Sequence, residues 1–138
     1  MRELKVRAWY KPYKQMCQVE SLRFDGNGVY TAVLIEESFY DRRLVEADEI
    51  VIEQFTGLKD KNGVGVYEGD IIIQKSLGSN KSECRGKITY KEDHAAFMFE
   101  VYERGKIVMY LFLSEFNAEK TSEVIGNIHE NPELLEKK

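Results

Sequence analysis

Apolar and polar side chains alternate at the start of the chain. In "ELKVRAWY" (3–10), every second position from Leu4 to Ala8 is apolar, and the positions between them carry basic or aromatic side chains. Alternation over this length predicts a strand with one buried face. Pro12 interrupts the pattern, because proline has no backbone N–H to donate.

Extended segments continue up to residue 35. "QMCQV" (15–19) and "SLRF" (21–24) both suit a strand, and "DGNG" (25–28) is a strong hairpin turn because Asn-Gly and Asp-Gly tolerate positive φ. "VYTAVLI" (29–35) is β-branched and aromatic, which predicts the returning strand. The first 35 residues are therefore expected to form a small antiparallel meander.

Strand patterns also dominate the rest of the chain. The polar segment 36–49 fits a short helix or a loop, and "IVIEQF" (50–55) returns to strand character. "IIIQK" (71–75) begins with an unbroken apolar run, which predicts a strand covered on both faces. Segment 114–124 reads as a helical turn and loop, and further strands are predicted at 84–90, 95–102, 106–113 and 124–128.

The C-terminus has the residues that start a helix. Asn131 suits the N-cap, Pro132 the first helical position and Glu133 the first turn, so a short C-terminal helix is expected. The predicted class is mainly β, with two small antiparallel sheets or half-barrels and short helical segments. The chain is expected to be a single domain, 1–138, or two β subdomains, about 1–35 and 50–128, joined by 36–49.

The turn-rich stretch "FTGLKDKNGVGVYEGDIII" (55–73) superficially resembles a phosphate-binding loop. The spacing G-x₄-G-K-[ST] is absent, and the last turn leads into a strand, so no helix N-terminus is available for an anion. Glycine and Asn-Gly suit tight turns, and aspartate in a turn accepts backbone hydrogen bonds. We therefore interpret the stretch as a structural turn motif made by Gly57, Asp60, Asn62, Gly63, Gly69 and Asp70.

The same stretch carries a family resemblance. "QFTGLKDKNGVGVYEGDII" (54–72), the start "MRELKVRAWY" (1–10) and the end "EVIGNIHENPELLE" (123–136) resemble, in this order, motifs of the YopX family of phages and prophages. Tyr10 stands where that family commonly has Asp, and "VGV" (64–66) replaces a polar pair and Ile. The resemblance implies a mainly β, phage-encoded protein of uncharacterised role, with no catalytic residues to transfer.

Charge argues against a general duplex-DNA binder. The formal net charge is −4 and the pI about 5.3, whereas neutralisation of phosphates favours basic proteins. The charge is uneven, with six basic and three acidic side chains in residues 1–35, and seven acidic and two basic in residues 36–56. Two solvated surfaces explain this most simply, and two patches that meet across a subunit contact are the alternative.

Neither a signal peptide nor a membrane-spanning apolar run is visible, so we expect a protein of the bacterial host cytoplasm. Its two cysteines, Cys17 and Cys84, are then expected to be reduced thiols. They form no CxxC motif, and His94 and His129 are far apart, so no metal site and no cofactor are predicted.

Catalysis has little support in the sequence. Asp60 and Asp70 could divide acid and base roles, but aspartate in a turn more often holds backbone. No nucleophile elbow or other catalytic spacing is present. We therefore predict that the protein is not an enzyme.

Two non-enzymatic functions remain. The favoured one is an accessory protein that binds protein, either an unknown phage or host partner or itself, with "VYTAVLI" (29–35) and "KIVMYLFL" (106–113) as candidate edge strands for a homo-oligomer. The alternative is a nucleic-acid-binding module that uses basic and aromatic side chains near the N-terminus. Its candidate contacts are Arg7, Trp9, Lys11 and Lys14.

Overall fold

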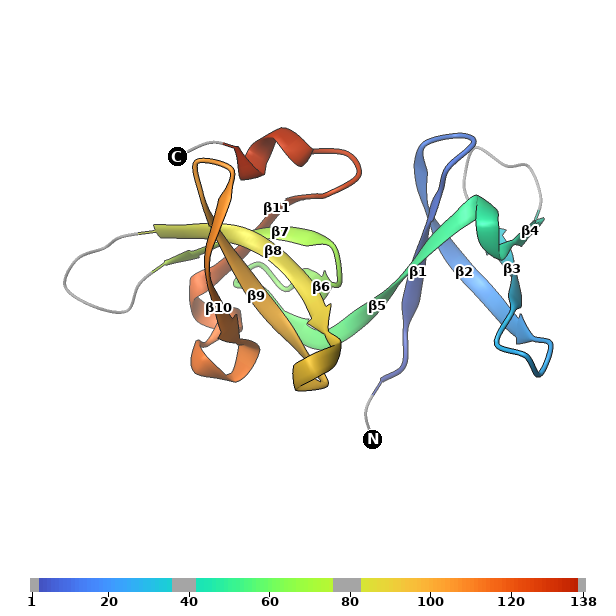
Figure 1. The fold of residues 1–138 in the computed structure, drawn as a ribbon, viewed down its shortest axis with the longest axis horizontal. Coiled ribbons are helices and arrows are strands. Elements are labelled where there is room, and N and C mark those ends of the chain that lie inside the picture. The colour runs from blue at the N-terminus through green and yellow to red at the C-terminus, as the bar shows by residue number, and fades with distance from the viewer. Residues whose placement is uncertain (1–2, 36–41, 76–82, 137–138) are drawn as a thin grey trace. The chain divides into compact units, whose positions relative to one another are not determined.

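The computed structural model describes residues 3–35, 42–75 and 83–136. By its contacts the chain divides into two compact units, with the boundary between Gln54 and Phe55. The first unit is Glu3–Gln54, and the second runs from Phe55 onward. The boundary lies inside one strand, β5 (Ile50–Lys59), whose first half belongs to one unit and whose second half belongs to the other (Figure 1).

The first unit is an antiparallel sheet in the order β4-β3-β2-β1-β5. Its core lies on the face that carries Ala8, Cys17 and Leu34, as the alternation near the N-terminus predicts. Besides β5, its elements are β1 (Val6–Tyr10), β2 (Gln15–Phe24), β3 (Tyr30–Ile35), β4 (Arg43–Glu46) and the 3-10 turn η1 (Ala47–Glu49).

Strand β4 corrects two expectations. Segment 36–49 was expected to be a helix or a loop, but its described part contains β4, which pairs with β3 from Thr31↔Glu46 to Leu34↔Arg43. Strand β3 therefore lies between β2 and β4, and the prediction that "VYTAVLI" (29–35) forms an edge is wrong. Only Val45 of the four residues of β4 is buried, so the segment is mainly polar and is not recognisable as a strand from its sequence.

The second unit is built on a five-stranded antiparallel sheet in the order β10-β9-β8-β7-β11, and a short β6 pairs with the second half of β5. Its strands are β6 (Gly65–Tyr67), β7 (Asp70–Lys75), β8 (Glu83–Lys91), β9 (Ala96–Glu103), β10 (Lys106–Phe112) and β11 (Ser122–Asn127). Its short helical pieces are η2 (Glu92–His94), η3 (Leu113–Glu115), α1 (Ala118–Thr121) and η4 (Pro132–Leu135).

Strand β7 is the central element of this unit's packing. Ile71 and Ile72 are adjacent and both fully buried, although they point to opposite faces, which confirms the predicted two-sided coverage. Ile72 packs in the core cluster with Ile88 and Phe99. On the strand beside it, Gly86 is required by a close approach, because a Cβ there would lie 2.0 Å from the carbonyl oxygen of Glu100.

The mainly β class and the two antiparallel sheets are confirmed, and the sheets are open rather than closed into barrels. The predicted C-terminal helix is a single 3-10 turn, η4. Asn131 and Pro132 occupy its first positions as expected, but the Asn131 side chain does not cap it. It instead accepts a hydrogen bond from the Asn127 N–H at 3.2 Å.

Candidate functional site

The first half of the turn motif is organised by one buried carboxylate. Asp60 is only 3% exposed. One of its oxygens accepts hydrogen bonds from the backbone N–H groups of Asn62 (2.8 Å) and Val64 (2.9 Å), and the other accepts from the N–H of Val124 at 2.9 Å. Gly63 has φ +79°, which the reversal requires. Asp60 therefore shapes its own turn and attaches that turn to β11.

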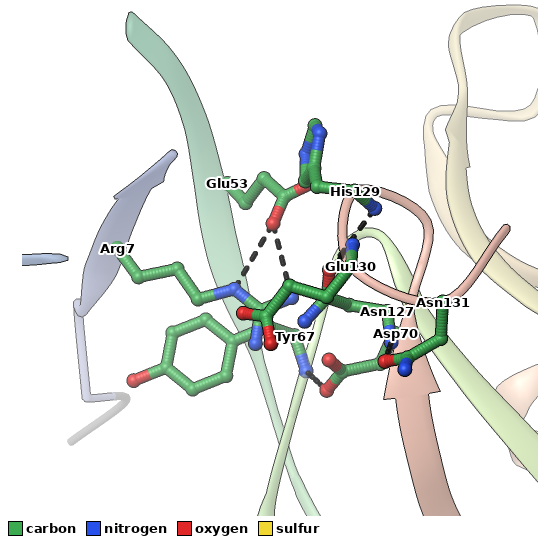
Figure 2. Close-up of polar contacts among 8 residues, drawn as sticks. All are labelled: Arg7, Glu53, Tyr67, Asp70, Asn127, His129, Glu130 and Asn131. Atoms are coloured by element: carbon green, nitrogen blue, oxygen red, sulfur yellow. Dashed lines mark hydrogen bonds and ion pairs between the residues drawn. The ribbon is translucent and has the colours of Figure 1, made fainter. Parts of the chain in front are cut away.

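A second carboxylate organises the next turn. Asp70 is buried, and its Oδ2 accepts a hydrogen bond from the Tyr67 N–H at 2.8 Å, as Figure 2 shows. Gly69, at φ +87°, donates its N–H to the Ile88 carbonyl (2.8 Å) and accepts from the Ile128 N–H (2.9 Å). This corner thus ties β8 to the residues that follow β11.

The loop after β11 is closed by its own asparagines. Asn127 accepts hydrogen bonds from the N–H groups of His129 (3.0 Å) and Glu130 (2.9 Å), and Asn131 points back to the Asn127 backbone (Figure 2). In these contacts, as in those of Asp60 and Asp70, a side-chain oxygen accepts a hydrogen bond from a backbone N–H group. Gly57 completes the predicted motif within β5, where it has φ +91°.

No metal-binding cluster is built around these carboxylates: within the described residues, no three His, Cys, Asp or Glu side chains are placed to hold an ion. Cys17 lies in the core of the first unit and Cys84 is half-buried in β8, and neither forms a disulfide bond. His94 contacts Asp93 at 3.0 Å on an exposed turn.

The proposed nucleic-acid contacts lie in the first unit, where Arg7 and Lys11 have partners within the protein. Arg7 and Glu53 are cross-strand neighbours on β1 and β5, and two guanidinium nitrogens lie 3.0 Å from one Glu53 oxygen (Figure 2). Glu53 is 3% exposed, so Arg7 neutralises a buried carboxylate. The Lys11 ammonium donates to the Asp48 carbonyl at 3.2 Å. Trp9 is half-buried on β1, and Lys14 is exposed in the following turn.

The aromatic rings beside this segment are engaged as well. The Arg43 guanidinium lies 4.8 Å from the centre of the Tyr13 ring and donates a hydrogen bond to its hydroxyl at 2.9 Å. Tyr10 is buried and packs edge-on against Tyr13, with ring centres 5.1 Å apart. These contacts hold the Tyr10 and Tyr13 rings within the first unit, with Tyr13 still 49% exposed.

Strand β10 carries apolar side chains that the core of the second unit does not bury. It follows β9 through a two-residue turn, Arg104 and Gly105, in which both residues have positive φ. Six of its seven residues are apolar, yet five of them are 39% to 49% exposed, namely Ile107, Val108, Met109, Tyr110 and Phe112. The sequence suggested this segment as an interface because it has more apolar positions than one buried face requires.

The outer edge of β10 also differs from the other sheet ends in the described part of the chain. Strand β4 has four residues and is partly charged, and β6 has three. Strand β11 is covered by the Asp60 turn, through Val124 and through the Lys61 N–H, which donates to the Ser122 carbonyl at 2.9 Å. Strand β10 has seven residues and, among the strands that the structure describes, pairs only with β9. Proteins usually block such edges, because an uncovered strand pairs with another chain.

A shallow groove adjoins the end of β10. It measures about 510 Å³, and its lining includes the apolar Leu58, Leu113 and Phe116 and the acidic Glu115 and Glu119. Sequence reasoning missed the groove, because Leu58 is far from the other lining residues in the chain.

The pKa of one tyrosine on β9, the strand next to β10, is shifted. Burial and a hydrogen bond to Glu100 raise the pKa of Tyr102 above its usual range, so this phenol stays neutral.

None of the helices in the described residues has the length and apolar character needed to cross a membrane. A comparison with curated proteins gives no match. Among solved structures, the chain is similar to the crystal structure of protein EF1440 from Enterococcus faecalis. The identity is 29%, the match covers 98% of this chain and 99% of that one, and the TM-score is 0.64. A model of the YopX protein family matches residues 5–136. The chain therefore belongs to the YopX family.

Proposed function

We propose that this chain is a non-enzymatic accessory protein of phage or prophage origin that acts in the bacterial cytoplasm by binding protein through β10. The observation that carries the proposal is an apolar edge strand of seven residues whose side chains remain about half exposed. A partner strand would satisfy the unpaired backbone groups of β10 and cover its apolar side chains at the same time. The phage context rests on the family resemblance.

The roles of the two turn carboxylates support a non-enzymatic function. Asp60 and Asp70 are both buried and both accept hydrogen bonds from backbone N–H groups, which is how carboxylates stabilise turns. A general acid or base needs an open approach to a substrate.

Site-specific photo-crosslinking tests the proposal. We would replace Val108 by the photoreactive p-benzoylphenylalanine, irradiate the producing cells, and identify adducts by peptide mass. The matched control places the same group at Val29, which is 57% exposed against 48% for Val108 but lies in the first unit. We expect protein adducts from position 108, few from position 29, and loss of the adduct when Met109→Lys puts a charge on the edge. The absence of any protein adduct at position 108 would contradict the proposal.

Binding of single-stranded nucleic acid is the competing function. Its support is weaker because Arg7 is paired with Glu53, and Arg43 covers the Tyr13 ring. A salt titration of oligonucleotide binding separates the two functions. Affinity that falls steeply with salt, and that is lost in a Lys11→Glu/Lys14→Glu double variant, would favour nucleic acid over protein.

A further inference from the structure

The sequence contains two Asn-Gly pairs, Asn27-Gly28 and Asn62-Gly63, and all four residues are exposed in turns. An asparagine that precedes glycine can lose its side-chain amide without an enzyme. The backbone nitrogen of the glycine attacks the side-chain amide carbon of the asparagine, and glycine has no side chain to hinder the approach. The reaction therefore depends on whether the glycine N–H is free and whether the turn can change its shape.

Hydrogen bonds oppose this attack in the turn at 60–64. The Gly63 N–H, which would supply the attacking nitrogen, donates to the Asp60 carbonyl at 3.0 Å. The buried Asp60 carboxylate accepts from the Val124 N–H at 2.9 Å, and the Lys61 N–H donates to a carbonyl of β11 at 2.9 Å. The turn must therefore open away from β11 before its glycine nitrogen can reach the amide carbon.

The turn at 25–29 has none of these restraints in the described part of the chain. No described residue accepts a hydrogen bond from the Gly28 N–H. The Asp25 carboxylate is exposed and accepts from two N–H groups of its own turn, at 2.8 and 3.2 Å. Gly26 and Gly28 flank the asparagine, and an added Cβ at either would meet no atom within 4 Å. This turn can change its shape without breaking a contact to another strand.

We infer that Asn27 is a site of spontaneous modification in the folded protein, whereas the fold protects Asn62. The Gly28 nitrogen forms a bond to Cγ of Asn27, and the amide nitrogen leaves as ammonia with the proton of the glycine N–H. Water then opens the cyclic imide, adding a hydroxyl group to one carbonyl and a proton to the ring nitrogen. Attack at the main-chain carbonyl gives isoaspartate, and attack at Cγ gives aspartate. No oxidant or reductant takes part, and the inference is independent of β10.

Isoaspartate would alter the β2–β3 hairpin. The main chain then passes through the side-chain carbons, so the turn gains a backbone atom, and a new carboxylate lies close to Asp25. The hydrogen bonds of Asp25 depend on normal backbone spacing and are expected to be lost. Loop length fixes the register of a hairpin, so the adjacent pairs Phe24↔Tyr30 and Arg23↔Thr31 should loosen.

Mass spectrometry of the full chain, incubated for days at mildly alkaline pH and then digested, tests the inference. Conversion of an amide to an acid raises the mass, and fragmentation locates the change and distinguishes isoaspartate from aspartate. Asn62 is the matched control in the same molecule, because glycine follows both asparagines. Asn27 should react at least about tenfold faster than Asn62 in the folded protein, since the anchored turn must first break its hydrogen bonds. In concentrated urea the two rates should converge.

The effect on the hairpin is measured by hydrogen exchange across residues 22–31. Aged wild type should exchange faster there than fresh protein, and an Asn27→Ser variant aged in the same way should not. Equal rates at the two asparagines in the folded chain, or no reaction at Asn27 while the chain in urea reacts, would overturn the inference. A difference that persists in urea would assign it to local sequence and overturn the protective role of the fold. Unchanged exchange after Asn27 has reacted would overturn the effect on the hairpin.

Discussion

Two turns, one in each unit, use the same chemistry to different ends. Residues 25–29 and 60–64 share the pattern Asp-x-Asn-Gly-Val, in which any residue can stand at x. In both turns the carboxylate accepts from the N–H groups two and four residues ahead, and the aspartate N–H donates to the valine carbonyl. Asp25 is exposed, whereas Asp60 is buried and uses its second oxygen to hold Val124.

The difference shows what local sequence determines and what it leaves open. The short motif is enough to close a loop, because every contact that shapes the turn lies within five residues. The motif does not determine whether the turn also covers a neighbouring strand. The backbone even differs at the second position, where Gly26 has φ +90° and Lys61 does not have a positive φ. The Asp60 turn differs in function because β11 lies beside it.

The largest expected contrast comes from removing one charged oxygen at each turn. Asp60→Asn replaces an acceptor by an amide N–H₂ group, which must face a backbone donor, so we expect a loss of about 2 kcal/mol in the free energy of unfolding. Asp25→Asn can keep its accepting oxygen in place and should lose less than about 0.5 kcal/mol. Urea unfolding of both variants measures the contrast. Equal losses would show that the Val124 contact contributes nothing.

A smaller and equal effect is expected at the glycines of the two turns. Gly28 has φ +87° and Gly63 has φ +79°, and an added Cβ would have open space at both positions. Alanine at either site is therefore strained only by its backbone, which costs about 1 kcal/mol. Thermal melting of Gly28→Ala and Gly63→Ala should give matching shifts. A much larger loss at Gly63 would mean that the anchored turn cannot relax.

The smallest effect on stability is expected at the uncovered edge of β10, in contrast to the edge of β11, which the Asp60 turn covers. Val108→Lys places a charge on the exposed edge of β10, and we expect its free energy of unfolding, measured on dilute monomer, to change by less than about 0.5 kcal/mol. Its effect should appear in self-association instead. A loss of several kcal/mol in dilute solution would show that Val108 packs within its own chain.

Sequence reasoning succeeded where the determining contacts are local. The mainly β class followed from alternation, and the turn residues followed from the conformations that glycine, asparagine and aspartate tolerate. It failed where a distant segment decides the outcome. Strand β4 is polar because one face is solvated, so its sequence does not indicate a strand beside β3. The partner of Arg7 is 46 residues away, and nothing near Arg7 in the chain indicates the buried Glu53.

The apolar character of β10 was visible in the sequence, but its exposure was not. A run such as "KIVMYLF" fits a strand buried on both faces as well as it fits an interface, and the same reasoning correctly placed "IIIQK" (71–75) inside the sheet. The two differ in their neighbours, since β7 lies between β8 and β11, whereas within the described residues β10 pairs only with β9.

The place of β5 has a consequence for how the chain is made. Strand β1 pairs with β2 on one side and with β5 on the other, although β5 begins forty residues after β1 ends. During synthesis, β1 to β4 leave the ribosome first, and β1 keeps an unpaired edge until residue 54 emerges. The first unit can then close before the second exists. A pause in translation shortly after β5 would give that closure time, and a pause before it would prolong the exposure of β1.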